Sequence, residues 1–118
     1  MDPLVHPWDG IDADNPVALL SRKRINAERI MVARVELEPG CEVAVHNHEM
    51  EQVACVMSGR VLWRLGVKGT PDYRELEVTG GNVVHLPPNF PHGVTAIEHT
   101  LIFDILSPPG EMGVDKQK

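Results

Sequence analysis

Glycine and proline occur so often in this chain that long helices are excluded as its main elements. Ten glycines and ten prolines are spread over 118 residues, which places a turn-forming residue about every six positions. Proline breaks a helix because it lacks the backbone N–H and clashes with the preceding turn, whereas short strands joined by turns tolerate this spacing. The sequence therefore predicts an all-β fold built from many short strands.

The apolar residues between these turns follow the two-residue period of β-strands. In residues 28–37, every second side chain from Met31 to Leu37 is apolar, which puts these side chains on one face of a strand. Similar short apolar or alternating runs recur along the chain, and most of them end within two residues of a Gly or Pro. The predicted strands are residues 17–20, 28–37, 42–48, 52–57, 60–65, 74–78, 83–86, 93–97 and 100–106.

Composition and charge argue against several classes of function. The formal net charge is −6 and the eleven basic residues are scattered, so we expect no nucleic-acid partner. The apolar runs are only a few residues long, so no membrane span is expected. The first residues lack the pattern of a secretory signal, which favours a cytoplasmic location. In that compartment Cys41 and Cys55 are expected to be free thiols.

The histidines carry the clearest chemical signal. His46 and His48 are two apart in a predicted strand, so their imidazoles face one space, and the same parity directs Gln52 inward. The proline-rich loop 87–91 then delivers His92 on a stiff backbone. These four residues are the expected ligands of one divalent metal ion. Glu51 replaces Gln52 in this set if a bulge shifts the strand.

The spacing of these residues resembles that of a known family. Gly40-x5-His46-x-His48-x3-Gln52-x6-Gly59 is similar to the first motif of the cupin superfamily, with glutamine where glutamate is usual. Gly81-x5-Pro87-x-Asn89-x2-His92 resembles the second cupin motif, with Asn89 in place of a glycine. Asparagine tolerates the left-handed backbone conformation better than most residues, so we expect the turn to be kept.

The resemblance implies a jelly-roll β-barrel with a metal ion in an open pocket, usually in a homodimer. We therefore expect an extended segment over residues 1–16 that Trp8 anchors, a single cupin barrel over residues 17–109, and a polar C-terminal tail over residues 110–118 with mobile last residues. Nitrogen and oxygen donors suit Fe, Mn, Ni, Co, Cu or Zn, and ligand type alone does not choose among them. Because all four ligands are neutral, the ion would keep its full charge and favour a small anionic substrate.

Asp104 is the expected catalytic acid or base. It lies within the apolar strand 100–106, where a buried carboxylate is costly without a function or a partner. Strand parity leaves open whether Asp104 faces the interior or solvent. The segment 104–109 also resembles small cupins of the pectin-degradation type, in which an aspartate at this position is functional and an arginine follows the Ser-Pro-Pro segment. Here Gly110 stands in place of that arginine, which weakens an unsaturated uronate as the substrate.

Three functions remain open from the sequence. The leading hypothesis is a metal-dependent isomerase or lyase acting on a small oxygenated acid or sugar derivative, with Asp104 moving a proton. The alternatives are an Fe(II) dioxygenase and a non-enzymatic module that binds or senses a small molecule. Among the other polar residues, we interpret His85 as a hydrogen-bonded wall residue, His99 as a turn residue, and three arginines as surface charges that could substitute for the missing cation: Arg34, Arg60 and Arg64.

Overall fold

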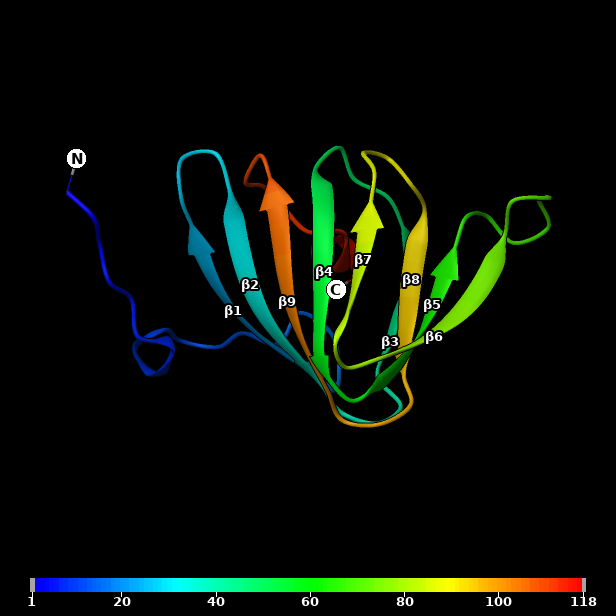
Figure 1. The fold of residues 1–118 in the computed structure, drawn as a ribbon, viewed down its shortest axis with the longest axis horizontal. Coiled ribbons are helices and arrows are strands. Elements are labelled where there is room, and N and C mark those ends of the chain that lie inside the picture. The colour runs from blue at the N-terminus through cyan, green and yellow to red at the C-terminus, as the bar shows by residue number, and fades with distance from the viewer. Residues whose placement is uncertain (1, 118) are drawn as a thin grey trace.

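Nine β-strands in two antiparallel sheets make up most of the structure, a computed structural model that describes residues 2–117 (Figure 1). No helix in this part of the chain is long and apolar enough to cross a membrane. The two helical elements are single short 3-10 turns, η1 and η2. The elements run in the order η1 Trp8–Gly10, β1 Leu20–Asn26, β2 Met31–Leu37, β3 Glu42–His46, β4 Glu51–Ser58, β5 Arg60–Leu65, β6 Arg74–Thr79, β7 Asn82–Leu86, β8 His92–Ala96, β9 Thr100–Ser107 and η2 Gly113–Gln117.

The strands are arranged as a jelly roll. One sheet has the order β1-β2-β9-β4-β7 and the other β3-β8-β5-β6, so the chain crosses repeatedly between them. In Figure 1 the five-stranded sheet lies at the left and centre of the view and the four-stranded sheet at the right. The all-β jelly-roll fold predicted from the sequence is confirmed.

The alternation predicted for residues 31–37 is present in β2. The inward side chains of this strand, from Met31 to Leu37, are at most 5% exposed, whereas the intervening residues are only partly buried. β2 lies between β1 and β9, so its inward face contributes to the centre of the five-stranded sheet. Side chains of the opposite sheet, including Val61 and Trp63, complete the core.

The first strand differs from the prediction. A strand was expected over residues 17–20, but β1 begins at Leu20 and runs to Asn26, and Leu19 before it has a positive φ of 67°. The cause is Arg22, whose side chain points inward and is almost completely buried although it is charged. Carboxylate groups balance the buried charge of Arg22. The strand therefore lacks the alternation of apolar residues by which it could have been predicted from the sequence.

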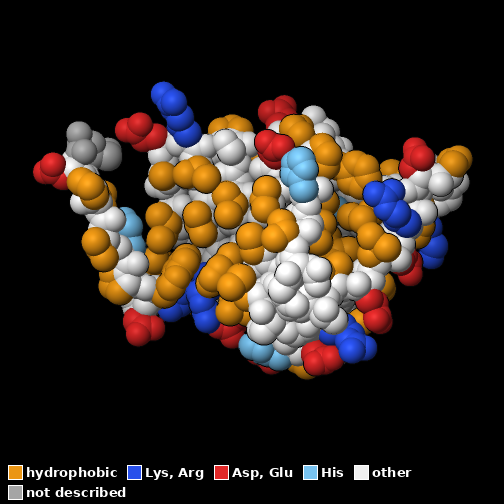
Figure 2. All heavy atoms as spheres, viewed as in Figure 1, with side chains coloured by type: hydrophobic (Ala, Val, Ile, Leu, Met, Phe, Trp, Pro, Cys, Tyr) orange, Lys and Arg blue, Asp and Glu red, His pale blue; other side chains and the backbone are white. Residues whose placement is uncertain are grey.

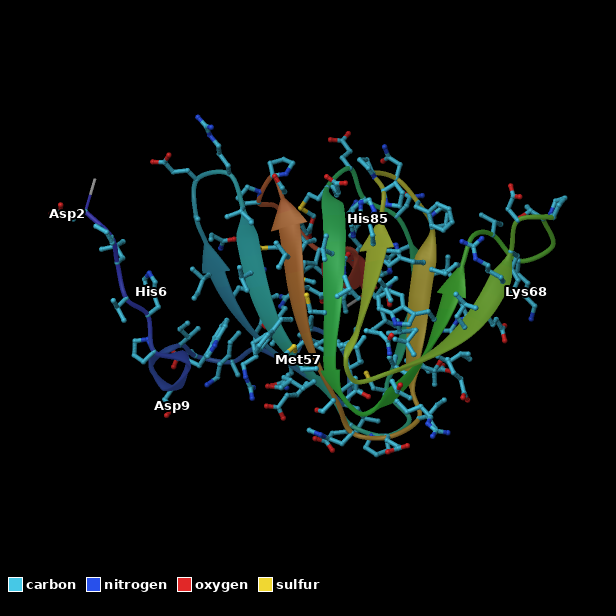
Figure 3. All side chains as sticks on the ribbon, in the orientation of Figure 1. Asp2, His6, Asp9, Met57, Lys68 and His85 are labelled. Carbon is cyan, nitrogen blue, oxygen red and sulfur yellow. The ribbon has the colours of Figure 1, made fainter. Side chains whose placement is uncertain are left out.

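The segments before and after the barrel behave differently. The chain before η1 extends away from the sheets, where Figure 3 places Asp2 and His6. Trp8 in η1 stacks on Phe103 of β9, with ring centroids 6.0 Å apart. At the other end, the residues interpreted as a polar tail fold back: η2 contacts β3, and Met112 and Val114 are buried. Their two apolar side chains alternate with polar residues, so this segment looked polar in sequence.

Candidate metal centre

Three histidines meet at one end of the four-stranded sheet. His46 ends β3 and His92 begins β8, and these two residues are partners in the strand register. His48 follows in the turn that leads to β4. Each imidazole offers one ring nitrogen, and these nitrogens all lie within 4.8 Å of one another. This separation allows all three rings to bind a single ion.

The loop that carries His92 is fixed to the turn that carries His48. The backbone N–H of Asn89 donates to the carbonyl of His48, with 2.7 Å between the nitrogen and the oxygen. Asn89 has a positive φ of 64°, as expected for a residue that replaces a glycine of the motif. The two sequence motifs are therefore joined by the backbone as well as by the histidines.

The three imidazoles share one pattern of hydrogen bonds. Each Nδ1 lies 2.8 or 2.9 Å from a backbone carbonyl two residues away in sequence: Ala44 for His46, Met50 for His48 and Phe90 for His92. Because a carbonyl oxygen can only accept, Nδ1 carries the hydrogen in each neutral ring. The lone pair is then on Nε2, which is the state that binds a metal ion.

Gln52 adds an oxygen donor to the three imidazole nitrogens. Its amide Nε2 donates to Asp104 Oδ1 at 2.8 Å, which turns the amide oxygen Oε1 toward His48 Nε2 at 3.0 Å. Two acceptors then face each other at hydrogen-bond distance, which is unfavourable unless a proton or a cation lies between them. The residues present therefore fit a bound divalent ion, with three imidazole nitrogens and one amide oxygen as donors.

Burial favours the neutral form of two of these histidines, His46 and His92. Burial lowers the pKa of His92 to about 4, against a smaller opposing effect of its hydrogen bond to the Phe90 carbonyl. Burial also lowers the pKa of His46 below its ordinary value. Both rings are thus deprotonated on Nε2 near neutral pH, so no proton has to leave before a metal ion binds.

The histidines line a pocket between the two sheets. Its volume is about 60 Å³, enough for on the order of four water-sized groups. Trp63 and the aliphatic side chains of both sheets form its apolar wall, and its polar lining consists of His46, His48, His92, Gln52, Asp104 and Arg22. The C-terminal segment closes one side through three residues, Met112, Gly113 and Val114.

The structure places Asp104 inside. It is 6% exposed, lines the pocket and contacts Gln52, so the question that strand parity left open is resolved in favour of the interior. Burial raises the pKa of Asp104 to about 6, and the hydrogen bond from Gln52 acts in the opposite direction. Glu51, the alternative ligand, points outward instead: it is exposed and its carboxylate is 2.7 Å from His85 Nε2.

The remaining histidines and arginines considered from the sequence stay outside the pocket. His85 and His99 are exposed, and each pairs with glutamates of the surface. Among the described residues, the pocket lining includes none of three arginines, Arg34, Arg60 and Arg64. Arg64 instead donates to Thr95 and to the backbone of β3 and β8, which ties these strands together.

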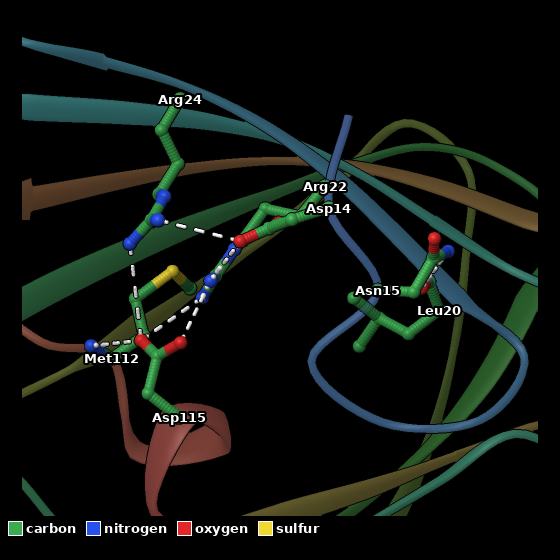
Figure 4. Close-up of polar contacts among 7 residues, drawn as sticks. All are labelled: Asp14, Asn15, Leu20, Arg22, Arg24, Met112 and Asp115. Atoms are coloured by element: carbon green, nitrogen blue, oxygen red, sulfur yellow. Dashed lines mark hydrogen bonds and ion pairs between the residues drawn. The ribbon is translucent and has the colours of Figure 1, made fainter. Parts of the chain in front are cut away.

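Arg22 is the polar pocket residue that sequence reasoning missed. Its guanidinium donates to both carboxylate oxygens of Asp14 and to both of Asp115, as Figure 4 shows. Burial lowers the pKa of Arg22, but these hydrogen bonds outweigh it and leave the pKa above its ordinary value. The only sequence signal was position: Arg22 is two residues from Leu20, which is also inward.

These features define the class of protein. A family model described as a cupin domain matches residues 33–106, a range that contains the three histidines, Gln52 and Asp104. The chain belongs to the cupin family. Among curated proteins, no sequence matches the chain.

Several solved structures are similar to this chain. KdgF from Halomonas sp. is 24% identical, with a TM-score of 0.75 over 86% of this chain and 92% of that one. An RmlC-like cupin from Shewanella frigidimarina is 21% identical, with a TM-score of 0.81 over 93% of this chain and 95% of that one. Oxalate decarboxylase from Lactobacillus farciminis, as a formate complex, is 12% identical, with a TM-score of 0.76 over 94% of this chain but 36% of that one. These likenesses establish the fold.

Proposed function

We propose that the protein is a metal-dependent enzyme of the isomerase or lyase type that acts on a small oxygenated acid. The observation that carries the proposal is the arrangement of three imidazoles whose Nδ1 atoms are all bound to backbone carbonyls. This leaves three Nε2 lone pairs and the Gln52 oxygen available to one ion. When bound, a divalent ion in this site would polarise a carbonyl or enol oxygen of the substrate.

The side chains favour an anionic substrate. The histidines and Gln52 are neutral ligands, so they leave the charge of an ion unbalanced, and a carboxylate or enolate oxygen would balance it. The name of one structural neighbour supports the same class of substrate, since oxalate decarboxylase acts on a small carboxylic acid. The pocket volume of about 60 Å³ further limits the size of the ligand that fits while the C-terminal segment is in place.

Asp104 is proposed to move the proton. It is the one carboxylate among the described residues that line the pocket, and it lies behind Gln52 without an arginine or lysine partner in the hydrogen bonds of the site. Its carboxylate takes a proton from one carbon of the substrate and returns it to another, which isomerises the substrate without any further reactant. Asp104 is 6% exposed, and Ile102 and Leu106 on the same face of β9 are buried apolar side chains.

Turnover without oxygen tests the reaction class. The metal-loaded protein is incubated anaerobically with an unsaturated uronate and with small oxo and hydroxy acids, and the products are followed by NMR. We expect conversion of at least one acid in the parent, and a loss of about 10²-fold or more in Asp104→Asn with unchanged metal content. Conversion only with oxygen uptake would establish a dioxygenase instead, and binding without conversion would establish a binding module.

A further inference from the structure

Two carboxylates of the protein itself are bound to Arg22, a residue that lines the pocket. Arg22 has two edges that can each hold a carboxylate through a pair of hydrogen bonds. Asp14 occupies the edge formed by Nε and Nη2, at 3.0 and 2.8 Å. Asp115, from the C-terminal segment, occupies the edge formed by Nη1 and Nη2, at 3.0 and 2.7 Å. Figure 4 shows the two carboxylates on the same guanidinium.

The two carboxylates are held in different ways. Asp14 and Arg22 also exchange two backbone hydrogen bonds, both 2.9 Å long, so Asp14 belongs to the sheet framework. Asp115 belongs to a segment that enters at Gly110 and is attached at its far end by Gln117, which pairs with the backbone of Ala44 at 2.9 Å. The second edge of Arg22 can therefore be vacated by moving a short terminal segment without breaking the sheet.

The same segment covers His46. A Cβ atom on Gly113 would lie 1.7 Å from Cδ2 of His46, so the backbone at this position rests directly against that ring. Gln117 Nε2 lies 3.2 Å from His46 Nδ1, and Met112 and Val114 are buried in the pocket wall. A ligand larger than a few atoms can reach the histidines from this side only when the segment moves.

Charge favours an anion in place of Asp115. Arg22 and Arg24 are balanced by Asp14 and Asp115, with Arg24 3.4 Å from Asp14 and 3.9 Å from Asp115. If Asp115 leaves, two guanidinium groups face one carboxylate, and the buried Arg22 loses half of its hydrogen bonds to carboxylates. A carboxylate supplied by a ligand restores both the charge balance and the paired hydrogen bonds.

We propose that Arg22 is the carboxylate-binding residue of the pocket, and that Asp115 occupies its position as an internal ligand until the carboxylate of a bound acid displaces the C-terminal segment. Arg22 thus supplies the cation that Gly110 does not provide at the position where related cupins carry an arginine. The identity of the ligand as an acid substrate rests on the proposed function, whereas the carboxylate site itself does not.

Acetate binding to the metal-free protein tests this site. Isotope-labelled full-length protein is titrated with acetate at constant ionic strength, with chloride as the reference anion, and NMR follows the Arg22 Nε–H signal and the amides of residues 113–117. Asp115→Asn removes the internal carboxylate and keeps the shape of the side chain. We expect it to bind acetate about tenfold or more tightly than the parent, because an attached competitor acts at a high effective concentration.

Two further variants complete the experiment. Glu111→Gln removes a carboxylate from an exposed position of the same segment, and should bind acetate as the parent does. Gln117→Ala loosens the far end without touching Arg22 and should also tighten acetate binding, which keeps the test decisive if Asp115→Asn folds poorly. Equal affinity in all four proteins, or acetate shifts that avoid Arg22, would overturn the proposal. No metal is present, so the result is independent of the metal centre.

Discussion

Each histidine of the candidate metal centre is oriented by the chain close to it in sequence. The carbonyl that receives Nδ1 is two residues before His46 and His92, and two residues after His48. Such short connections fix the tautomer wherever the residue lies in the fold. What brings the three rings together is the pairing of β3 with β8, which makes His46 and His92 register partners. The orientation of each imidazole is therefore fixed by nearby residues in sequence, whereas the pairing of strands brings the three imidazoles together.

At Gly113 the absence of a side chain decides the local structure. In Gly113→Ala the new methyl group would overlap the His46 ring, so either the C-terminal segment or the ring must move. We expect a loss of about 1–3 kcal/mol in the free energy of unfolding, measured by urea denaturation. Gly10→Ala is the control, since its Cβ would approach no atom closer than 3.3 Å. An unchanged stability of Gly113→Ala would mean that the segment does not rest on His46.

At the scale of elements, the strands that the sequence predicted are those with one apolar and one polar face. β2 is the clearest case, because its inward residues from Met31 to Leu37 are all apolar. β1 could not be predicted in the same way, since its central inward residue is Arg22. The partner Asp115 that makes this residue acceptable lies 93 positions away. An ion pair between residues so far apart in sequence produces no periodic pattern from which it could be predicted. The folded position of η2 was missed for the same reason.

In the candidate site, too, some residues could be predicted from the sequence and others could not. His46, His48, Gln52 and His92 could be brought together from the spacing within two short motifs, although His48 lies in the turn after β3 and not in the strand that the parity argument assumed. The inward position of Asp104 could not, since parity left both faces of β9 open. The contribution of Arg22 and the C-terminal segment depends on how distant elements pack, which neither spacing nor resemblance indicated.

The cluster of Arg22 with two aspartates predicts sensitivity of η2 and β1 to acid. The hydrogen bonds and charge of Arg22 outweigh burial and hold the pKa of Asp115 below its ordinary value; the hydrogen bond from Arg22 likewise lowers the pKa of Asp14. A lowered pKa in the folded state stabilises the fold above the ordinary pKa, and this stabilisation is lost as pH falls through the folded value. We expect the free energy of unfolding to decrease below about pH 4, and to decrease less steeply in Asp115→Asn.

Urea denaturation between pH 3 and pH 7 measures this dependence. Glu111→Gln serves as the control for the loss of one acidic group, and should follow the parent. Parallel curves for the parent and Asp115→Asn would show that Arg22 does not stabilise the ionised form of Asp115.

At the scale of the whole molecule, the outer face of the five-stranded sheet carries many apolar side chains, visible across Figure 2. Met57 and Val83 on this face are 50% and 62% exposed. A second copy of the chain would cover such a surface, and the family resemblance likewise predicts a homodimer. We expect a mass near twice 13.1 kDa by sedimentation equilibrium, and a shift toward monomer in Val83→Lys. A monomeric parent would contradict this prediction.

The central claim is that His46, His48, Gln52 and His92 hold one divalent metal ion. The most direct test is elemental analysis of protein purified without chelators, for the parent, His46→Ala and His92→Ala. His85→Ala and His99→Ala are matched controls, because these histidines are exposed on the surface. We expect close to one transition-metal ion per chain in the parent and both controls, and a loss of at least about tenfold in the two site variants. A parent that contains no metal after reconstitution, or site variants that retain it, would contradict the claim.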